Sequence, residues 1–159
     1  MSPIRSAWQE FQHEVRSRLQ YESAEPEEQL RQPFERFMEA VGNALGFKQV
    51  QCIAPRRLPD QLGKPDFAVY RDGLLVGYVE LKAPGTGANA DAFKGRNKEQ
   101  FDRFRALPNL LYTDGSEWAL YRSGEQITLI SPNAPAELER LLRDFLTWRP
   151  IIPFTPKGT

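Results

Sequence analysis

PDFAVYRDGLLVGYVELKAPG, which spans residues 65–85, is the stretch that decides the fold of this chain. Its Val, Leu, Phe and Tyr residues are typical of strands, and the Arg-Asp-Gly at 71–73 is typical of a tight turn. The stretch therefore predicts an antiparallel hairpin. Asp66 opens its first strand, and the Glu-Leu-Lys at 80–82 ends its second, so charged groups stand in otherwise strand-forming surroundings.

The length of the turn decides whether the two acidic groups, Asp66 and Glu80, can act together. A two-residue turn pairs Arg71 with Leu74. Because side chains alternate between the two faces of a strand, that pairing places the two carboxylates on opposite sides of the sheet.

A three-residue turn, with Gly73 in the left-handed conformation, pairs Tyr70 with Leu74 and Asp66 with Tyr78. Both carboxylates and the ammonium at position 82 then share one face. The carboxylates become diagonal neighbours, roughly 7–8 Å apart at the backbone, which is close enough to hold one cation. We predict this register, with the following residues on the common face: Asp66, Ala68, Tyr70, Leu74, Val76, Tyr78, Glu80 and Lys82.

Two carboxylates and an ammonium on one sheet face suit a hard divalent cation. Mg²⁺ prefers oxygen ligands, and Asp66, Glu80 and the backbone carbonyl of Leu81 supply them, with Mn²⁺ as a substitute. Lys82 would lie beside the attacking water and a phosphate oxygen, where it offsets developing charge. The alternative is a solvated strand end with a surface ion pair between Glu80 and Lys82.

The Pro-Asp at 65–66 and the Glu-Leu-Lys at 80–82 resemble the two halves of the PD-(D/E)xK nuclease motif. That resemblance implies the restriction-endonuclease-like α/β fold, in which helices flank a mixed sheet and the metal site lies at one sheet edge. The motif is short, so the rest of the chain has to agree with it.

Composition indicates one globular domain. The chain has 159 residues, 26% of them charged, with 21 basic and 21 acidic side chains, so any DNA contact must come from local clustering of charge. No stretch resembles a membrane span or a signal peptide, and a single cysteine indicates a cytoplasmic setting. We expect the domain to cover residues 1–148, with residues 149–159, which contain three prolines, as a linker or tail.

The remaining elements follow from periodicity and turn residues. We predict helices and strands in the order α-α-β-β-β-α-β-β-β-α, with helices over residues 1–19, 25–45, 92–107 and 135–148, and with strands over residues 47–53, 109–113, 117–122 and 126–131 beside the central hairpin. The residues of the glycine- and alanine-rich loop at 84–92 are typical of a mobile segment near the site.

In the helix predicted over residues 25–45, Glu27 falls on the buried apolar stripe, whereas Glu28 falls away from it. Favourable placement near the positive end of the helix dipole is one explanation for an acid at this position. The other, which we favour, is a third carboxylate for the metal site.

The helix predicted over residues 92–107 places Asn97 and Gln100 on its apolar side and surrounds them with basic residues. A local excess of positive charge is what phosphate binding requires. We predict that this helix, together with the loop that precedes Asp66, contacts DNA through the following residues: Lys64, Lys94, Arg96, Asn97, Lys98 and Gln100.

Residues 94–114, taken with the central hairpin, make the resemblance more specific. Together they are similar to the N-terminal nuclease domain of type ISP restriction–modification enzymes and of related type I-like restriction subunits. In that family the nuclease accompanies a helicase-like motor and an adenine methyltransferase, which the resemblance implies as partner modules. By position, Gln100 matches the glutamine of the family's QxxxY motif, whose tyrosine is here Phe104, and Glu27 matches a helix glutamate, with Glu28 as the alternative.

The residues and the resemblance together predict a Mg²⁺-dependent endonuclease acting on double-stranded DNA. Asp66, Glu80, Lys82, Glu27 and Gln100 are its predicted catalytic residues. The chain is expected to be either the nuclease part of a larger enzyme or a stand-alone relative. The alternatives are a catalytically idle DNA-binding module of the same fold and a scaffold in which the charged groups form a buried ion cluster.

Overall fold

The computed structural model describes residues 2–132 and 134–150. The helices and strands have these bounds: α1 Arg5–Leu19, η1 Glu28–Leu30, α2 Arg31–Ala44, β1 Val50–Ile53, β2 Phe67–Arg71, β3 Leu74–Leu81, η2 Ala90–Ala92, α3 Gly95–Phe104, β4 Leu110–Thr113, β5 Trp118–Arg122, β6 Glu125–Ile130 and α4 Pro135–Leu146. The predicted order of elements is confirmed. Most of the predicted tail, residues 151–159, lies outside the described residues.

All six strands form one sheet in which the spatial order is the chain order, β1 to β6. β3 and β4 are parallel, and every other neighbouring pair is antiparallel. The connection between the parallel strands carries α3, because a parallel pair cannot be joined by a tight turn. The mixed sheet flanked by helices confirms the predicted α/β class. Within the described residues, no helix is long and apolar enough to cross a membrane.

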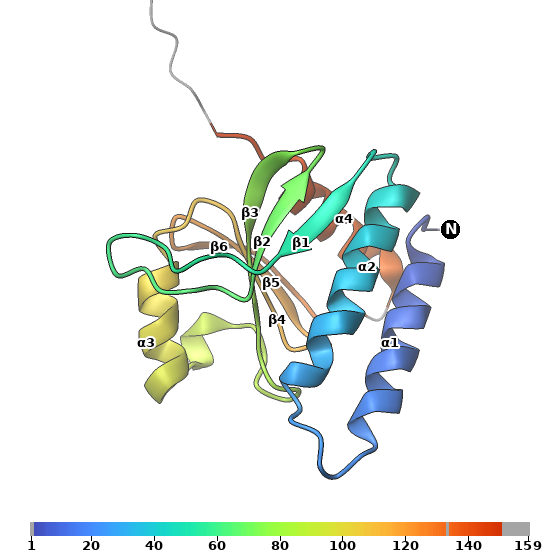
Figure 1. The fold of residues 1–159 in the computed structure, drawn as a ribbon, viewed down its shortest axis with the longest axis horizontal. Helices are drawn as coiled ribbons and strands as arrows, with labels where there is room; N and C mark the ends of the chain where they lie inside the picture. Colours follow the sequence, from blue (N-terminus) through green and yellow to red (C-terminus); the bar gives the residue numbers. More distant parts are fainter. Residues whose placement is uncertain (1, 133, 151–159) are drawn as a thin grey trace, which may run out of the picture.

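Helices cover the two faces of the sheet unequally. Figure 1 shows α1 and α2 side by side on one face, and α3 alone on the opposite face. The first face, with α4, buries a core centred on Trp118, whose ring lies 5.8–6.2 Å from those of Trp8, Phe11, Phe34 and Phe37. We call this the first core.

The face under α3 buries a smaller second core, to which Phe101 and Phe104 of the helix and Tyr112 and Tyr121 of the sheet contribute. Val79 and Leu81 of β3 belong to the first core, whereas Tyr78 packs against the second. Because side chains alternate along a strand, Glu80 and Lys82 lie on the same face as Tyr78. The charged residues of the hairpin are therefore under the edge of α3.

The central hairpin does not have the predicted turn. Arg71 pairs with Leu74, so the turn has two residues, Asp72 and Gly73. Both have positive φ, 52° and 83°, as the preferred two-residue hairpin turn requires. The prediction of a three-residue turn was wrong, because an Asp-Gly pair satisfies that tighter geometry without help from a third residue.

A β-bulge restores the side-chain parity that this turn would otherwise reverse. Tyr70 pairs with Leu75, but Val69 pairs with Gly77, which leaves Val76 as an extra residue in β3. The pairing continues to Phe67 with Val79, and one further step places Asp66 directly opposite Glu80. The predicted partner of Asp66, Tyr78, instead faces Ala68. Val76, predicted on the Glu80 face, packs in the first core.

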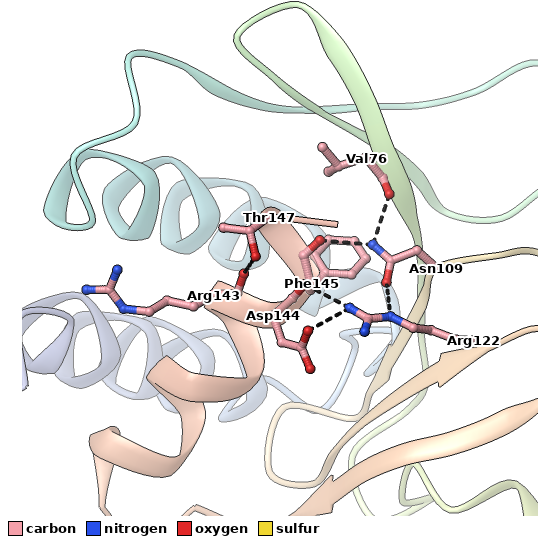
Figure 2. A network of polar contacts seen from close by, with 7 residues as sticks. All are labelled: Val76, Asn109, Arg122, Arg143, Asp144, Phe145 and Thr147. Atoms are coloured by element: carbon pink, nitrogen blue, oxygen red, sulfur yellow. Dashed lines mark hydrogen bonds and ion pairs between the residues drawn. The ribbon is translucent and has the colours of Figure 1, made fainter. Parts of the chain in front are cut away.

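A polar network, which is buried at Asn109 and partly exposed at Arg122 and Asp144, ties α4 to the sheet (Figure 2). We call it the Asn109 cluster. The Asn109 amide donates to the carbonyl oxygens of Val76 and Phe145, each at 2.9 Å. Arg122 donates to the Asn109 side chain and to the backbone and side chain of Asp144. The cluster thus binds carbonyl groups in the last turn of α4, where the Phe145 oxygen also accepts from the Trp148 amide at 3.4 Å.

Gly77 lies against the Asn109 cluster, where there is no room for a side chain. A Cβ at Gly77 would lie 2.6 Å from the Asn109 carbonyl oxygen and 2.7 Å from the Phe145 ring. Real Cβ atoms do not approach other atoms so closely. The bulge, the glycine and the Asn109 cluster therefore fix the path of β3 toward the charged end of the hairpin.

Candidate active site

Asp66 and Glu80 lie on neighbouring strands and are interlocked through the backbone. The Asp66 amide donates to Glu80 Oε1 at 3.1 Å, and the Leu81 amide donates to Asp66 Oδ2 at 2.8 Å. Each carboxylate is thus held by the strand of the other. We call these two residues the carboxylate pair.

Lys82 stands next to the carboxylate pair and is 5% exposed, which is uncommon for a lysine. Its Nζ lies 3.4 Å from Glu80 Oε2 and donates to Asn97 Oδ1 at 3.1 Å. Asn97 of α3 therefore helps to position the ammonium. It lies on the side of the helix that the sequence predicted to face inward. The structure brings Asp66, Glu80, Lys82 and Asn97 together.

The electrostatics of the pair are those of crowded negative charge. Burial, the Asp66 carboxylate and a side-chain hydrogen bond with Asp66 raise the pKa of Glu80 to about 8, although Lys82 opposes the shift. A buried carboxyl group beside another carboxylate is stabilised when a proton or a cation neutralises it. The raised pKa of Glu80 means that added positive charge, from a proton or from a cation, stabilises this position.

Arg31 is a residue of this site for which the sequence analysis predicted no role. It is the first residue of α2, and its Nη1 lies 2.7 Å from Asp66 Oδ1. Its Nη2 donates to the Asp66 backbone oxygen at 3.3 Å, and its guanidinium carbon lies 4.6 Å from the centre of the Phe67 ring. The helical pattern gave no signal for this contact, which depends on where the start of α2 meets the end of β2.

Glu27 lies near the site but not on a buried helical face. The α-helix begins at Arg31, after the short turn η1, and Glu27 precedes both and is exposed. The predicted helix start at residue 25 and the predicted burial of Glu27 were therefore wrong. The surrounding protein still removes part of the water around Glu27, and this desolvation raises its pKa. The charges of Asp66 and Glu28 add to the rise, whereas those of Lys82 and Arg31 oppose it.

Within residues 2–132 and 134–150, no group of three or more His, Cys, Asp or Glu side chains is close enough together to hold a metal ion. The structure therefore gathers two of the three predicted carboxylate ligands, Asp66 and Glu80. The part of Glu27 as a third ligand stays a prediction, as does that of Glu28.

Two buried polar atoms near the site have no hydrogen-bond partner among the described residues: Gln100 Oε1 and Tyr112 Oη. Gln100 lies three residues after Asn97 and therefore on the same side of α3. Tyr112 is the β4 partner of Glu80, and burial together with the charges of Glu80 and Asp66 raises the pKa of its hydroxyl. The sequence analysis did not identify Tyr112, because its position depends on the parallel pairing of β3 with β4.

The basic residues predicted to contact DNA are exposed, whereas Asn97 and Gln100 are half-buried. Lys94, Arg96 and Lys98 lie at the start of α3, and Lys98 pairs with Asp102 at 3.1 Å. Lys64 follows Gly63, where an added Cβ would lie 3.3 Å from the ring of Phe104. The loop before β2 therefore packs against α3, and these basic residues belong to the side of the sheet that carries Lys82.

The loop between β3 and α3 is anchored, which differs from the predicted mobile segment. Asp114 Oδ2 accepts hydrogen bonds from the amides of Gly85 and Gly87, at 3.1 and 2.8 Å. Glu117 Oε1 accepts from those of Ala88 and Asn89, at 2.8 and 3.2 Å. Two carboxylates distant in sequence thus satisfy the loop backbone, which the glycine-rich composition alone did not reveal.

Comparison with known proteins gives a match in structure and none in sequence. No protein-family model and no curated protein matches the chain. A solved chain from the "cryoEM structure DrdV-DNA complex" matches 91% of this chain with a TM-score of 0.71 and 17% sequence identity. The fold is restriction-endonuclease-like. This chain spans only 14% of the length of that chain.

Proposed function

We propose that this protein is a Mg²⁺-dependent endonuclease that hydrolyses phosphodiester bonds of double-stranded DNA. The observation that carries the proposal is the carboxylate pair, with the buried ammonium of Lys82 beside it. Such an arrangement matches the chemistry of phosphodiester hydrolysis, which needs a cation and a fixed positive charge at the phosphate. The fold shared with a chain of a DNA complex supports the choice of substrate.

The donor set fits a hard cation. Asp66 and Glu80 offer carboxylate oxygens, and the raised pKa of Glu80 indicates that the site favours additional positive charge. We propose that these two residues and the Leu81 carbonyl hold Mg²⁺ or Mn²⁺, with Glu27 as a further ligand. When bound, the cation polarises the phosphate and activates water for attack.

The chain's own residues orient the reaction. Lys82, which Asn97 and Glu80 hold in place, positions the attacking water and stabilises the charge that develops on the phosphate. Gln100, on the same side of α3 as Asn97, helps to hold the substrate. Glu27, at the exposed rim, either shares the metal or relays a proton through water.

DNA would lie along the side of the sheet that carries α3. Lys64, Lys94, Arg96 and Lys98 are exposed there and suit contacts with phosphates, which position a duplex without reading its sequence. We therefore propose cleavage with little sequence preference. Target choice would belong to a helicase-like motor and an adenine methyltransferase, in the same or an associated chain.

One observation favours a second candidate, a catalytically idle DNA-binding module. Both carboxylates already have cationic partners, Arg31 on Asp66 and Lys82 on Glu80. Ion pairs of this kind neutralise the pair without a metal. The two candidates differ in whether the site binds a divalent cation.

Nicking of supercoiled plasmid DNA in Mg²⁺ tests the proposal. We expect Asp66→Ala and Lys82→Met each to lower the rate by about a hundredfold or more, because each removes a group that acts on the reacting phosphate. Glu10→Ala, an exposed acid-to-alanine change on α1, is the matched control and should nick like the wild type. Equal nicking by Asp66→Ala and the wild type would remove Asp66 from the mechanism.

Calorimetric titration with Mn²⁺ distinguishes the idle module. The proposed enzyme binds Mn²⁺, and Asp66→Ala weakens that binding. A wild-type protein that binds DNA but gives no heat with Mn²⁺ would be the idle module instead.

A further inference from the structure

We propose that Arg31 is a phosphate-binding residue whose guanidinium pairs with Asp66 until a divalent cation displaces it. The inference rests on the proposed function and adds an order to it, in which the cation binds first and thereby frees an arginine for DNA. It is carried by the position of Arg31, which none of the catalytic roles above uses.

The contact between Arg31 and Asp66 is specific. One guanidinium nitrogen lies 2.7 Å from Asp66 Oδ1, and the other donates to the Asp66 backbone oxygen at 3.3 Å. The guanidinium carbon lies over the Phe67 ring, 4.6 Å from its centre. Arg31 thus makes polar contact with the side chain and backbone of one proposed metal ligand.

A cation and this guanidinium compete for the same oxygen atoms. The second oxygen of Asp66 is already bound to the Leu81 amide, at 2.8 Å. A divalent ion that takes Asp66 Oδ1 would place its charge next to that of Arg31, and like charges at contact distance repel. Binding of the cation therefore weakens the contact between Arg31 and Asp66.

The released side chain would remain at the site. Its guanidinium lies over the Phe67 ring, and the start of α2 fixes its backbone. A metal held by Asp66 and Glu80 would take the carboxylate partners of both cations. Lys82 keeps its contact with Asn97, whereas both polar contacts of Arg31 among the described residues are to Asp66. A guanidinium presents paired donors that match two phosphate oxygens, and about a quarter of the Arg31 side chain, 28%, is exposed to meet them.

Calorimetry with Mn²⁺ tests the first step. Arg31→Met removes the competing charge and keeps a long side chain over Phe67, so we expect it to bind Mn²⁺ about fivefold more tightly than the wild type or better. Arg31→Lys retains the charge and should bind Mn²⁺ much like the wild type. Arg36→Met, on the same helix but paired with Glu14 of α1, is the matched control and should leave the affinity unchanged.

Fluorescence anisotropy with a short phosphorothioate duplex tests the second step, with and without Mn²⁺. In Mn²⁺ we expect Arg31→Met to weaken DNA binding about fivefold and to lower the slope of log affinity against log salt by about one, the loss of one phosphate contact. Without Mn²⁺ the variant and the wild type should bind alike. A merely structural arginine would not give opposite effects on the two ligands, one of them dependent on metal.

Each outcome is decisive. Unchanged Mn²⁺ affinity in Arg31→Met overturns the competition, and tighter Mn²⁺ binding with unchanged DNA affinity overturns the phosphate contact. Asp66→Asn, measured in parallel, separates this inference from the proposed function. If the wild type and Asp66→Asn bind Mn²⁺ equally, the metal site itself is wrong and the inference falls with it; if only Asp66→Asn loses binding, the metal site stands whatever Arg31 does.

Discussion

The Asn109 cluster and the carboxylate pair are both polar and at least partly buried, yet they differ in how fully their groups are satisfied. In the Asn109 cluster, each amide and guanidinium contact ends on a carbonyl or carboxylate oxygen at a suitable distance. At the carboxylate pair, two acids share one region, Glu80 has a pKa of about 8, and Gln100 Oε1 and Tyr112 Oη lack partners among the described residues.

The difference separates a structural network from a functional one. Buried polar groups are normally hydrogen-bonded, and a fully satisfied network rigidifies the fold around it. A site that keeps crowded charge and unsatisfied groups costs stability, and such cost is typical of positions that bind a ligand. We infer that the Asn109 cluster holds β3 and α4 in place, which compensates for the stability that the carboxylate pair costs.

Breaking the Asn109 cluster should have the largest effect on stability. Asn109→Ala leaves the carbonyl oxygens of Val76 and Phe145 without their amide donor, so we expect the free energy of unfolding in urea to fall by about 3 kcal/mol. Asn43→Ala, an exposed change near the end of α2, should alter it by no more than about 0.5 kcal/mol. The folded variant should keep its Mn²⁺ affinity. A variant as stable as the wild type would show that these carbonyls have other partners.

Neutralising Glu80 of the carboxylate pair should raise the free energy of unfolding, whereas breaking the Asn109 cluster lowers it. The pKa of Glu80 is about 8 in the folded protein and about 4.3 in an unfolded chain, so the folded state binds more protons between these values. The free energy of unfolding therefore falls as pH rises through this window, by at most about 1.4 kcal/mol per pH unit from this group.

Glu80→Gln removes that dependence. We expect the variant and the wild type to be similarly stable near about pH 4, and the variant to be more stable by about 2 kcal/mol near about pH 8, allowing for the lost ion pair with Lys82. Urea unfolding at several pH values measures the difference. Glu125→Gln, an exposed change at the turn between β5 and β6, controls for net charge. A constant offset between wild type and Glu80→Gln at every pH would contradict a raised pKa.

The sequence predicted the side-chain parity of the central hairpin and not the geometry that produces it. The spacing of Asp66 and Glu80 requires one residue more than a two-residue turn supplies. The prediction placed that residue in the turn, but the structure places it in a bulge at Val76. The Asp-Gly pair was a visible signal for the tighter turn, whereas the bulge depends on contacts of Gly77 with Asn109 and Phe145.

Within the site, the sequence predicted what a single strand or helix determines. Lys82 follows Glu80 on one strand, and Asn97 faces inward because of helical periodicity. Arg31 and Tyr112 were missed, since each reaches the carboxylate pair through the packing of one element on another. Asp114 and Glu117 were missed as loop anchors for the same reason.

The two tyrosines of the second core allow the smallest and most closely matched test of the comparison. Tyr121 Oη accepts from the Ala90 amide at 2.8 Å and donates to the Ala88 oxygen at 2.7 Å, whereas Tyr112 Oη has no partner among the described residues. We expect Tyr121→Phe to lower the free energy of unfolding by about 1 kcal/mol, and Tyr112→Phe to leave it unchanged or to raise it by about 0.5 kcal/mol. Both variants lose one buried hydroxyl from rings 6.0 Å apart, so urea unfolding of the pair isolates hydrogen bonding from packing. If Tyr112→Phe destabilises as much as Tyr121→Phe, its hydroxyl is satisfied in solution and the contrast between the two polar regions is confined to Glu80. If Tyr112→Phe does not destabilise, the Tyr112 hydroxyl, next to Glu80 on β4, is one of the unsatisfied groups. Such a group is expected in a site that binds a ligand.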